Sequence, residues 1–322
     1  MNARAELIER VALRRRDQLG PLSDAAFQEL FDDVQADVER FVETPEEEAL
    51  LLVAKALDRH EEARKDEDLM DDDAFFSSRA KRMARLGRDC DTALSVDPTC
   101  FDAALLSTLS KDMDPDFALK PLLELEHRAI GTLAKGALPP DAWSDPKLRP
   151  LLRIKAAVAR TCLDSSRYRM AAKKAEEVIT LSPSDVTGVR HTCALAYARL
   201  EDETAFDALD VRFSRQGSTF EHLARTILLY KLGRMGAARR ALGGFSRLCE
   251  GGAYALIKPV MVDTYLPDRP EAPALSFAEA TLAVHEADPI ICDVPDFVAW
   301  AQGQRDTYFA AQDFARRKGY DW

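Results

Sequence analysis

Apolar side chains recur every three to four residues in almost every long segment of this chain, which is the spacing of one face of an α-helix. Alternating apolar and polar runs bounded by hairpin turns, the pattern of β-strands, do not occur. Segment 24–42 illustrates the helical pattern and places these apolar side chains on one face: Phe27, Leu30, Phe31, Val34, Val38 and Phe41. We therefore predict an all-α fold.

The N-terminal part of the chain contains two clear helix starts. Ser23 precedes the amphipathic segment and is a preferred N-cap, because its hydroxyl can accept a hydrogen bond from a free backbone N–H. Thr44 has the same position before a second helix, Pro45 suits the first helical residue, and the acids at 46–48 favour the positive end of the helix dipole. These signals predict a helical hairpin.

A recurring stop signal divides the rest of the chain into short helices. The stretch ALSVDPTCFDAAL (93–105) has an apolar helix end, an Asp-Pro pair and a new apolar run, and VITLSPSDVTGVRHTCALAY (178–197) repeats this order with Ser-Pro. Small residues that let two helices approach closely follow at intervals of 34 and 33 residues, at Ala171, Ala205 and Ala238. The pattern predicts antiparallel helix pairs at 152–182, 186–215 and 219–247.

These segments resemble the tetratricopeptide repeat (TPR) family, in which each unit of about 34 residues is a helix-turn-helix. The resemblance rests on ALSVDP (93–98), YRMAAKKAEEVITLSP (168–183) and LLYKLGRMGAARRAL (228–242). In the last of these, Gly233 matches the tight turn and Ala238 the small residue of the second helix. The resemblance implies a right-handed helical-repeat solenoid of antiparallel helix pairs, whose inner helix faces form a concave groove for an extended peptide or a helix.

Two further segments are similar to a poorly characterised group of bacterial TPR proteins. They are LPPDAWSDPKLRPLLR (138–153) and LSPSD followed by GVR (181–190). That group brings no established activity with it, so the similarity bears on the fold and not on the function.

The patterns divide the chain into three parts. Residues 1–73 form the N-terminal hairpin and an acidic connection, residues 74–250 the TPR-like array, and residues 251–322 an irregular crossing followed by capping helices. The connection, EEARKDEDLMDDD (61–73), lacks the glycine and the glutamate that an EF-hand requires at its sixth and twelfth positions. We expect it to be solvated and to bind no calcium.

The charge balance narrows the class of partner. The 322 residues include 44 Lys and Arg against 55 Asp and Glu, which gives a formal charge of −11 and a pI near 5.1. This balance opposes binding to nucleic acid or to an anionic membrane. No apolar run is long enough to span a bilayer or to act as a signal peptide, so we expect a cytoplasmic protein.

The six cysteines and five histidines show no metal-ligand spacing. The chain has no Cys-x-x-Cys pair and no His-Glu-x-x-His motif. We therefore expect the cysteines to be small buried hydrophobic residues of a reduced protein, and we expect no metal and no cofactor.

An acidic chain can still carry a basic groove. In the TPR register, inner positions of three consecutive helix pairs hold the basic and aromatic residues that we expect to bind a ligand: Arg153, Arg160, Arg190, His191, Tyr197, Tyr230 and Lys231. Arginine can clamp a carboxylate with two hydrogen bonds, which favours an acidic segment as ligand. In the alternative interpretation, the arginines pair with Asp185 or Glu176 and tie neighbouring repeats together, and the tyrosines pack between helices.

These observations favour a non-catalytic protein–protein interaction module, or adaptor, that binds a peptide or protein segment in a helical groove. An alternative is a helical sensor of a small acidic ligand or a peptide pheromone. An enzyme is less favoured, because the chain has no Gly-x-Ser-x-Gly nucleophile turn and no phosphate-binding loop ending in Lys-Ser or Lys-Thr. The expected partner is a protein or peptide, with no nucleic acid and no membrane.

Overall fold

The computed structural model describes residues 1–65, 67, 70–215 and 217–322. Throughout these residues the regular secondary structure is α-helical, with short 3₁₀ segments and no β-strand. Most helices pack against a neighbour in the sequence. The predicted all-α class is confirmed.

The packing divides the chain into two compact units. Unit 1 comprises Met1–Ala157 together with Leu266–Asp268, and unit 2 comprises Val158–Tyr265 and Arg269–Trp322. The first boundary falls inside helix α7 (Arg149–Asp164). The boundaries expected from the sequence, at residues 73 and 250, do not coincide with this division.

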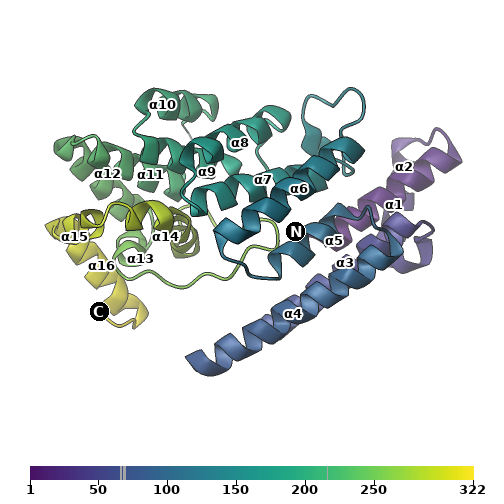
Figure 1. Ribbon diagram of the computed structural model, residues 1–322, viewed down its shortest axis with the longest axis horizontal. Helices are drawn as coiled ribbons and strands as arrows, with labels where there is room; N and C mark the ends of the chain where they lie inside the picture. The colour runs from purple at the N-terminus through teal and green to yellow at the C-terminus, as the bar shows by residue number, and fades with distance from the viewer. Residues whose placement is uncertain (66, 68–69, 216) are drawn as a thin grey trace. The chain divides into compact units, whose positions relative to one another are not determined.

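Unit 1 consists of the following elements, together with the first part of α7: α1 (Ala3–Leu19), α2 (Asp24–Ala36), η1 (Val38–Phe41), α3 (Pro45–Lys65), α4 (Asp72–Val96), α5 (Phe101–Leu109), α6 (Pro115–Leu133) and η3 (Ala142–Ser144). The two longest of these, α3 and α4, lie side by side (Figure 1). Helix α1 packs against α3, and α5 packs against both α3 and α4.

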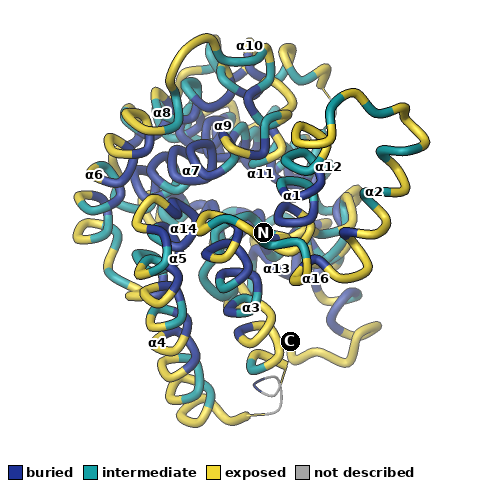
Figure 2. The backbone as a smooth tube through the Cα atoms, turned by 90° about the vertical axis from the view of Figure 1, so that its right-hand side faces the viewer, coloured by how far each residue is buried: buried dark blue, intermediate teal, exposed yellow. Residues whose placement is uncertain are grey.

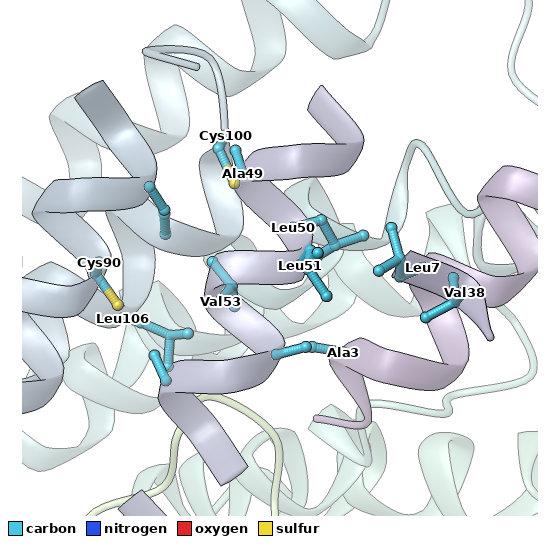
Figure 3. Close-up of a cluster of buried hydrophobic side chains, with 14 of the residues drawn as sticks. Ala3, Leu7, Val38, Ala49, Leu50, Leu51, Val53, Cys90, Cys100 and Leu106 are labelled. Carbon is cyan, nitrogen blue, oxygen red and sulfur yellow. The ribbon is translucent and has the colours of Figure 1, made fainter. Parts of the chain in front are cut away.

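The core of unit 1 joins side chains from α1, α2, η1, α3, α4 and α5. Figure 3 shows part of it, in which Leu7 of α1 and Val38 of η1 lie beside Leu50 of α3. Cys90 and Cys100 belong to the same buried cluster. Both cysteines are therefore small buried hydrophobic residues, as predicted.

Unit 2 continues from α7 with the following helices: α8 (Tyr168–Leu181), α9 (Val189–Leu200), α10 (Glu203–Arg212), α11 (Thr219–Lys231), α12 (Met235–Leu248), α13 (Gly252–Ile257), α14 (Phe277–Cys292), α15 (Asp296–Gln302) and α16 (Arg305–Lys318). Each predicted pair, at 152–182, 186–215 and 219–247, contains two helices. Helix α9 packs against α8, α10 and α11 and is buried over most of its length, whereas much of α10 is exposed (Figure 2).

The predicted stop signals end helices where the sequence placed them. Helix α4 ends at Val96, and the Oδ1 atom of Asp97 then accepts hydrogen bonds from the backbone N–H (2.8 Å) and the hydroxyl (2.7 Å) of Thr99. Between α11 and α12, Gly233 has a φ of +70°, which glycine adopts without a steric cost. Ser276 caps α14 by accepting a hydrogen bond from Glu279 N–H, after the irregular crossing that the prolines predicted.

Two local predictions are wrong. The helix predicted over 24–42 ends at Ala36, because the backbone at Asp37 leaves the helical conformation (φ −152°, ψ 75°) before a separate 3₁₀ turn begins. The acidic connection is not wholly solvated, because the Glu67 carboxylate is buried and accepts hydrogen bonds from Arg82 at 2.7 and 3.0 Å. Residues 66, 68 and 69 of that connection lie outside the described residues.

The C-terminal helices pack against earlier helices of unit 2. Helix α14 packs against α9, α11 and α13, and α16 packs against α12 and α13. The approach at the start of α13 is close, since a Cβ atom on Gly251 would lie 2.5 Å from the Phe277 ring and 2.6 Å from the Phe314 ring. Only glycine fits there without movement of these rings.

We expect Ala171→Leu in α8 to destabilise the protein, because Ala171 is fully buried and the larger side chain has no space. Overpacking of this kind costs about 1–3 kcal/mol of unfolding free energy. Urea denaturation measures the difference, with Lys173→Leu at an exposed position of the same helix as the control. An unchanged unfolding free energy for Ala171→Leu would show that the predicted close helix contact is not present.

Candidate functional site

A small pocket in unit 2 is the first candidate site. Its volume is about 220 Å³, and we call it the unit 2 pocket. It is formed by the 185–188 turn, the start of α9, α11, the 269–272 loop and α14. Its lining residues include Asp185, Val186, Thr187, Gly188, Arg190, His191, Phe220, Arg269, Glu271, Ala272, Glu279 and Leu282. Two of these, Arg190 and His191, are among the residues predicted to bind a ligand.

The 185–188 turn follows from its local sequence. Asp185 adopts a φ of +51° and Gly188 a φ of +64°, and the N–H of Gly188 donates to the carbonyl of Asp185 at 2.8 Å. Aspartate tolerates the left-handed region better than most residues, and glycine adopts it freely. A Cβ atom at Gly188 would also collide with the guanidinium group of Arg269. Glycine is therefore required at this position for two reasons.

Arg269 holds the turn against α14. Its Nε and Nη2 atoms donate to the two carboxylate oxygens of Glu286 at 2.6 and 2.8 Å. Its Nη1 atom donates to the backbone carbonyls of Thr187 (3.1 Å) and Gly188 (2.6 Å). The guanidinium plane of Arg269 therefore connects a buried carboxylate with the turn that lines the pocket.

Glu286 is the centre of this arrangement. Its side chain is fully buried, and it also receives a hydrogen bond from the Tyr265 hydroxyl (2.9 Å) and lies 3.3 Å from Arg160 Nη1. Burial alone would raise the pKa of this carboxyl group, but Arg269 and Arg160 outweigh burial and hold the pKa at about 2. Glu286 is therefore ionised and matched by two cations.

Three buried polar atoms, each on a residue that lines the unit 2 pocket, have no hydrogen-bond partner in the described part of the chain. They are Asp185 Oδ2, Thr187 Oγ1 and His191 Nδ1. Asp185 Oδ2 lies 3.7 Å from Arg190 Nη1, which is an ion pair but not a hydrogen bond. Buried polar atoms nearly always have partners, so this group is unusual.

Burial changes the protonation of two of these residues. It raises the pKa of Asp185 to about 6, against the opposing effect of Arg190 and Arg269. Burial, together with the charge of the same two arginines, lowers the pKa of His191 well below its usual value. The imidazole of His191 is therefore neutral at pH 7, and it stacks on Phe220 with the ring centroids 4.3 Å apart.

The second candidate is a larger groove in unit 1, with a volume of about 850 Å³. We call it the unit 1 groove; α1, the start of α3, the 97–102 segment, the end of α6 and the 145–150 segment line it. Half-buried Leu13 and Leu133 and buried Phe101 give it apolar surface. The Nε atom of Arg10, which also lines the groove, is buried without a hydrogen-bond partner among the described residues.

Arg153, predicted to bind a ligand, lies in a buried ion cluster of unit 1. Its guanidinium group donates to Glu6 at 2.7 and 3.0 Å, to Asp102 at 3.1 Å and to Asp268 at 3.0 Å. It also lies over the ring of Trp143, 5.2 Å from the centroid. These partners differ from the ones expected for it, and they satisfy the side chain without a ligand.

The other predicted residues belong to unit 2 and also have partners within the chain. Arg160 pairs with Asp164 (3.0 Å) and Glu286, and Arg190 pairs with Glu221 (3.2 Å) and with the Asp185 that the alternative interpretation named. The remaining contacts are Tyr197 with Glu176, Tyr230 with Phe297 and Trp300, and Lys231 with Glu201. Only Arg190 and His191 of the seven line the unit 2 pocket. Their role in ligand binding remains a prediction.

Sequence reasoning missed Arg269 and Glu286. Both lie in the C-terminal part that was expected to cap a stack, and neither belongs to a recognisable motif. A single charged residue in an otherwise apolar helical stretch, as in ATLAVHEA (280–287), is the available signal for Glu286, because such a residue needs a buried partner.

Other expected features can be compared with the described residues. Within them, no three His, Cys, Asp or Glu side chains are grouped so as to hold a metal ion, and no helix is both long and apolar enough to cross a membrane. Five cysteines are buried, but Cys292 at the end of α14 is exposed. The prediction of a buried cysteine is therefore wrong at that position.

Comparison with known proteins adds no family assignment. No protein-family model, no curated protein and no solved structure matches the chain.

We expect Asp185→Asn to stabilise the protein at neutral pH. The pKa of this carboxyl group is about 6 in the folded state and about 3.9 in an unfolded chain. Ionisation of Asp185 is therefore less favourable in the folded protein than in the unfolded chain, and it lowers the unfolding free energy as the pH rises between these two pKa values. Above pH 6 the whole of this loss is present. The variant should gain about 1–3 kcal/mol of unfolding free energy at pH 7.5 and little at pH 4. Urea denaturation at both pH values tests this, and an equal loss at both would show that the carboxylate stabilises the fold.

Arg153→Met should strongly destabilise unit 1, because it leaves Glu6 and Asp102 buried next to each other without their main cation. Breaking a buried ion pair from one side costs about 3–5 kcal/mol. The control is Arg4→Met, which removes an exposed pair with Asp58 and should cost less than about 1 kcal/mol. Thermal denaturation of both variants decides the matter, since similar melting temperatures would mean that the cluster is not a structural tie.

Proposed function

We propose that this protein is a non-catalytic binding module that holds an extended segment of a peptide or protein in the unit 1 groove. The observation that carries the proposal is a groove of about 850 Å³ whose lining includes half-buried Leu13 and Leu133 and buried Phe101. An extended peptide or a helix can place an apolar side chain in such a groove. The volume is within the range of about 300–1,000 Å³ that is typical of ligand sites.

The lining of the unit 1 groove favours an apolar anchor over a strongly acidic one. Leu13, Phe101 and Leu133 provide an apolar surface against which an apolar side chain of a ligand can pack. The formal charges of the lining are four basic and six acidic: Arg10, Arg14, Arg16 and Lys147 against Asp17, Glu46, Glu47, Asp97, Asp102 and Asp145. Arg14 is moreover bound to Glu43 and Glu47. The partner we propose is therefore a peptide or protein segment that is recognised mainly through an apolar side chain.

The TPR-like interpretation is consistent with this proposal and remains part of it. Helices α8 to α12 follow one another as short packed helices with the predicted boundaries, which supports a repeat solenoid in unit 2. A cytoplasmic location agrees with the composition of the chain and is proposed with it. The sensor alternative has a separate observation in its favour, the unmatched polar atoms of the unit 2 pocket, but the charges of that pocket do not favour the acidic ligand expected from the sequence.

Selection of linear peptides tests the function. A random peptide library displayed on phage is selected against the immobilised full-length protein, and fluorescence polarisation gives the affinities of the enriched peptides. Leu133→Glu should weaken binding by tenfold or more, because it places a charge where about 1.5–3 kcal/mol of apolar burial is expected. Leu13→Glu on α1 should have a similar effect.

Phe117→Glu is the matched control for this experiment. Phe117 lies on the same helix as Leu133, is 75% exposed and does not line the groove. Enriched peptides that bind wild type, Leu133→Glu and Phe117→Glu equally would show that the groove is not the binding site. Failure to enrich any peptide would contradict the proposed function.

A further inference from the structure

The unit 2 pocket has the properties of a binding site for a small molecule. Asp185 and His191 are 5% and 7% exposed, and each has a polar side-chain atom without a hydrogen-bond partner among the described residues. The Thr187 hydroxyl in the same lining is also unmatched. Three such atoms on residues that line one cavity favour a ligand that completes their hydrogen bonds.

Both arginines of the unit 2 pocket, Arg190 and Arg269, already have partners within the chain. Arg269 uses three nitrogen atoms on Glu286 and on two backbone carbonyls. Arg190 donates from Nε to Glu221 at 3.2 Å and is paired with Asp185. An anionic ligand would have to compete with these carboxylates, so the pocket does not favour an anion.

The unmatched atoms instead require hydrogen-bond donors. Asp185 Oδ2 is an acceptor, Thr187 Oγ1 can accept, and one ring nitrogen of a neutral histidine accepts. The formal charges of the lining are three carboxylates, on Asp185, Glu271 and Glu279, against the two guanidinium groups of Arg190 and Arg269. A cation rich in N–H donors therefore fits both the hydrogen bonds and the charge.

We propose that the unit 2 pocket binds a small primary amine whose ammonium group donates to Asp185, Thr187 and His191. An ammonium group has three N–H donors, equal to the number of unmatched atoms. The proposal requires His191 to carry its proton on Nε2, so that Nδ1 is the acceptor. The carbon chain of the amine then lies against the apolar lining residues Val186, Ala272 and Leu282.

The size of the pocket restricts the amine. A volume of about 220 Å³ is below the range of about 300–1,000 Å³ that holds drug-sized ligands. The ligand class is therefore a short-chain amine. This inference goes beyond the proposed peptide-binding function and depends on different residues, so each can fail without the other.

Isothermal titration calorimetry with n-butylamine and 1,4-diaminobutane tests the inference on the full-length protein. Both amines should bind saturably, and n-butanol and butyrate, which lack the ammonium group, should not. Asp185→Asn should weaken amine binding by about tenfold or more, because it removes a charge-assisted hydrogen bond. Asparagine tolerates a positive φ and can still accept from Arg190 N–H, so this variant should fold.

A second pair of variants separates the hydroxyl from its surroundings. Thr187→Val should weaken amine binding several-fold, whereas Thr187→Ser keeps the hydroxyl and should bind like wild type. Asp306→Asn, at an exposed carboxylate of α16 outside the pocket, is the control and should leave the affinity unchanged.

Three results would overturn the inference. They are the absence of amine binding at millimolar concentrations, equal binding of butyrate or n-butanol, and equal affinity of wild type and Asp185→Asn for the amine.

Discussion

The pairing of Arg269 with Glu286 is the interaction on which the unit 2 pocket depends. Glu286 is fully buried on α14, and two nitrogen atoms of Arg269 donate hydrogen bonds to its carboxylate oxygens. The third nitrogen atom donates to the carbonyls of Thr187 and Gly188. A buried charge is tolerated only where its partners are this complete. The same guanidinium group therefore neutralises the interior of unit 2 and fixes the turn that lines the pocket.

The turn that Arg269 holds is costly in its own right. Asp185 has a positive φ, its carboxylate is buried with one oxygen unmatched, and its pKa is raised to about 6 by burial. Strained backbone and unmatched polar groups persist only where the surrounding structure enforces them, and they are typical of sites that bind or react. The surrounding structure here is the Arg269 contact and the stacked pair of His191 and Phe220.

Unit 1 uses the same physical solution at a different place. Arg153 is surrounded by Glu6, Asp102 and Asp268, and Arg10 and Arg149 lie within 4 Å of the same carboxylates. In both units, arginine neutralises buried acidic residues. The surplus of acidic residues in the sequence is thus partly internal, and a net charge of −11 does not by itself indicate a basic ligand surface.

The sequence by itself determined the helical class and several helix ends, because those signals act over a few residues. Ser23 and Ser276 cap their helices, Asp97 ends α4, and Gly233 turns the chain, each through contacts with near neighbours. The partners of the arginines were decided only by the tertiary structure. Arg153 and Asp268, for example, are 115 residues apart. The periodicity of a single helix does not determine which distant carboxylate an arginine on it will contact. For the same reason the sequence indicated His191 and Arg190 as site residues, while Arg269 and Glu286 were found only when the folded chain brought α14 to the 185–188 turn.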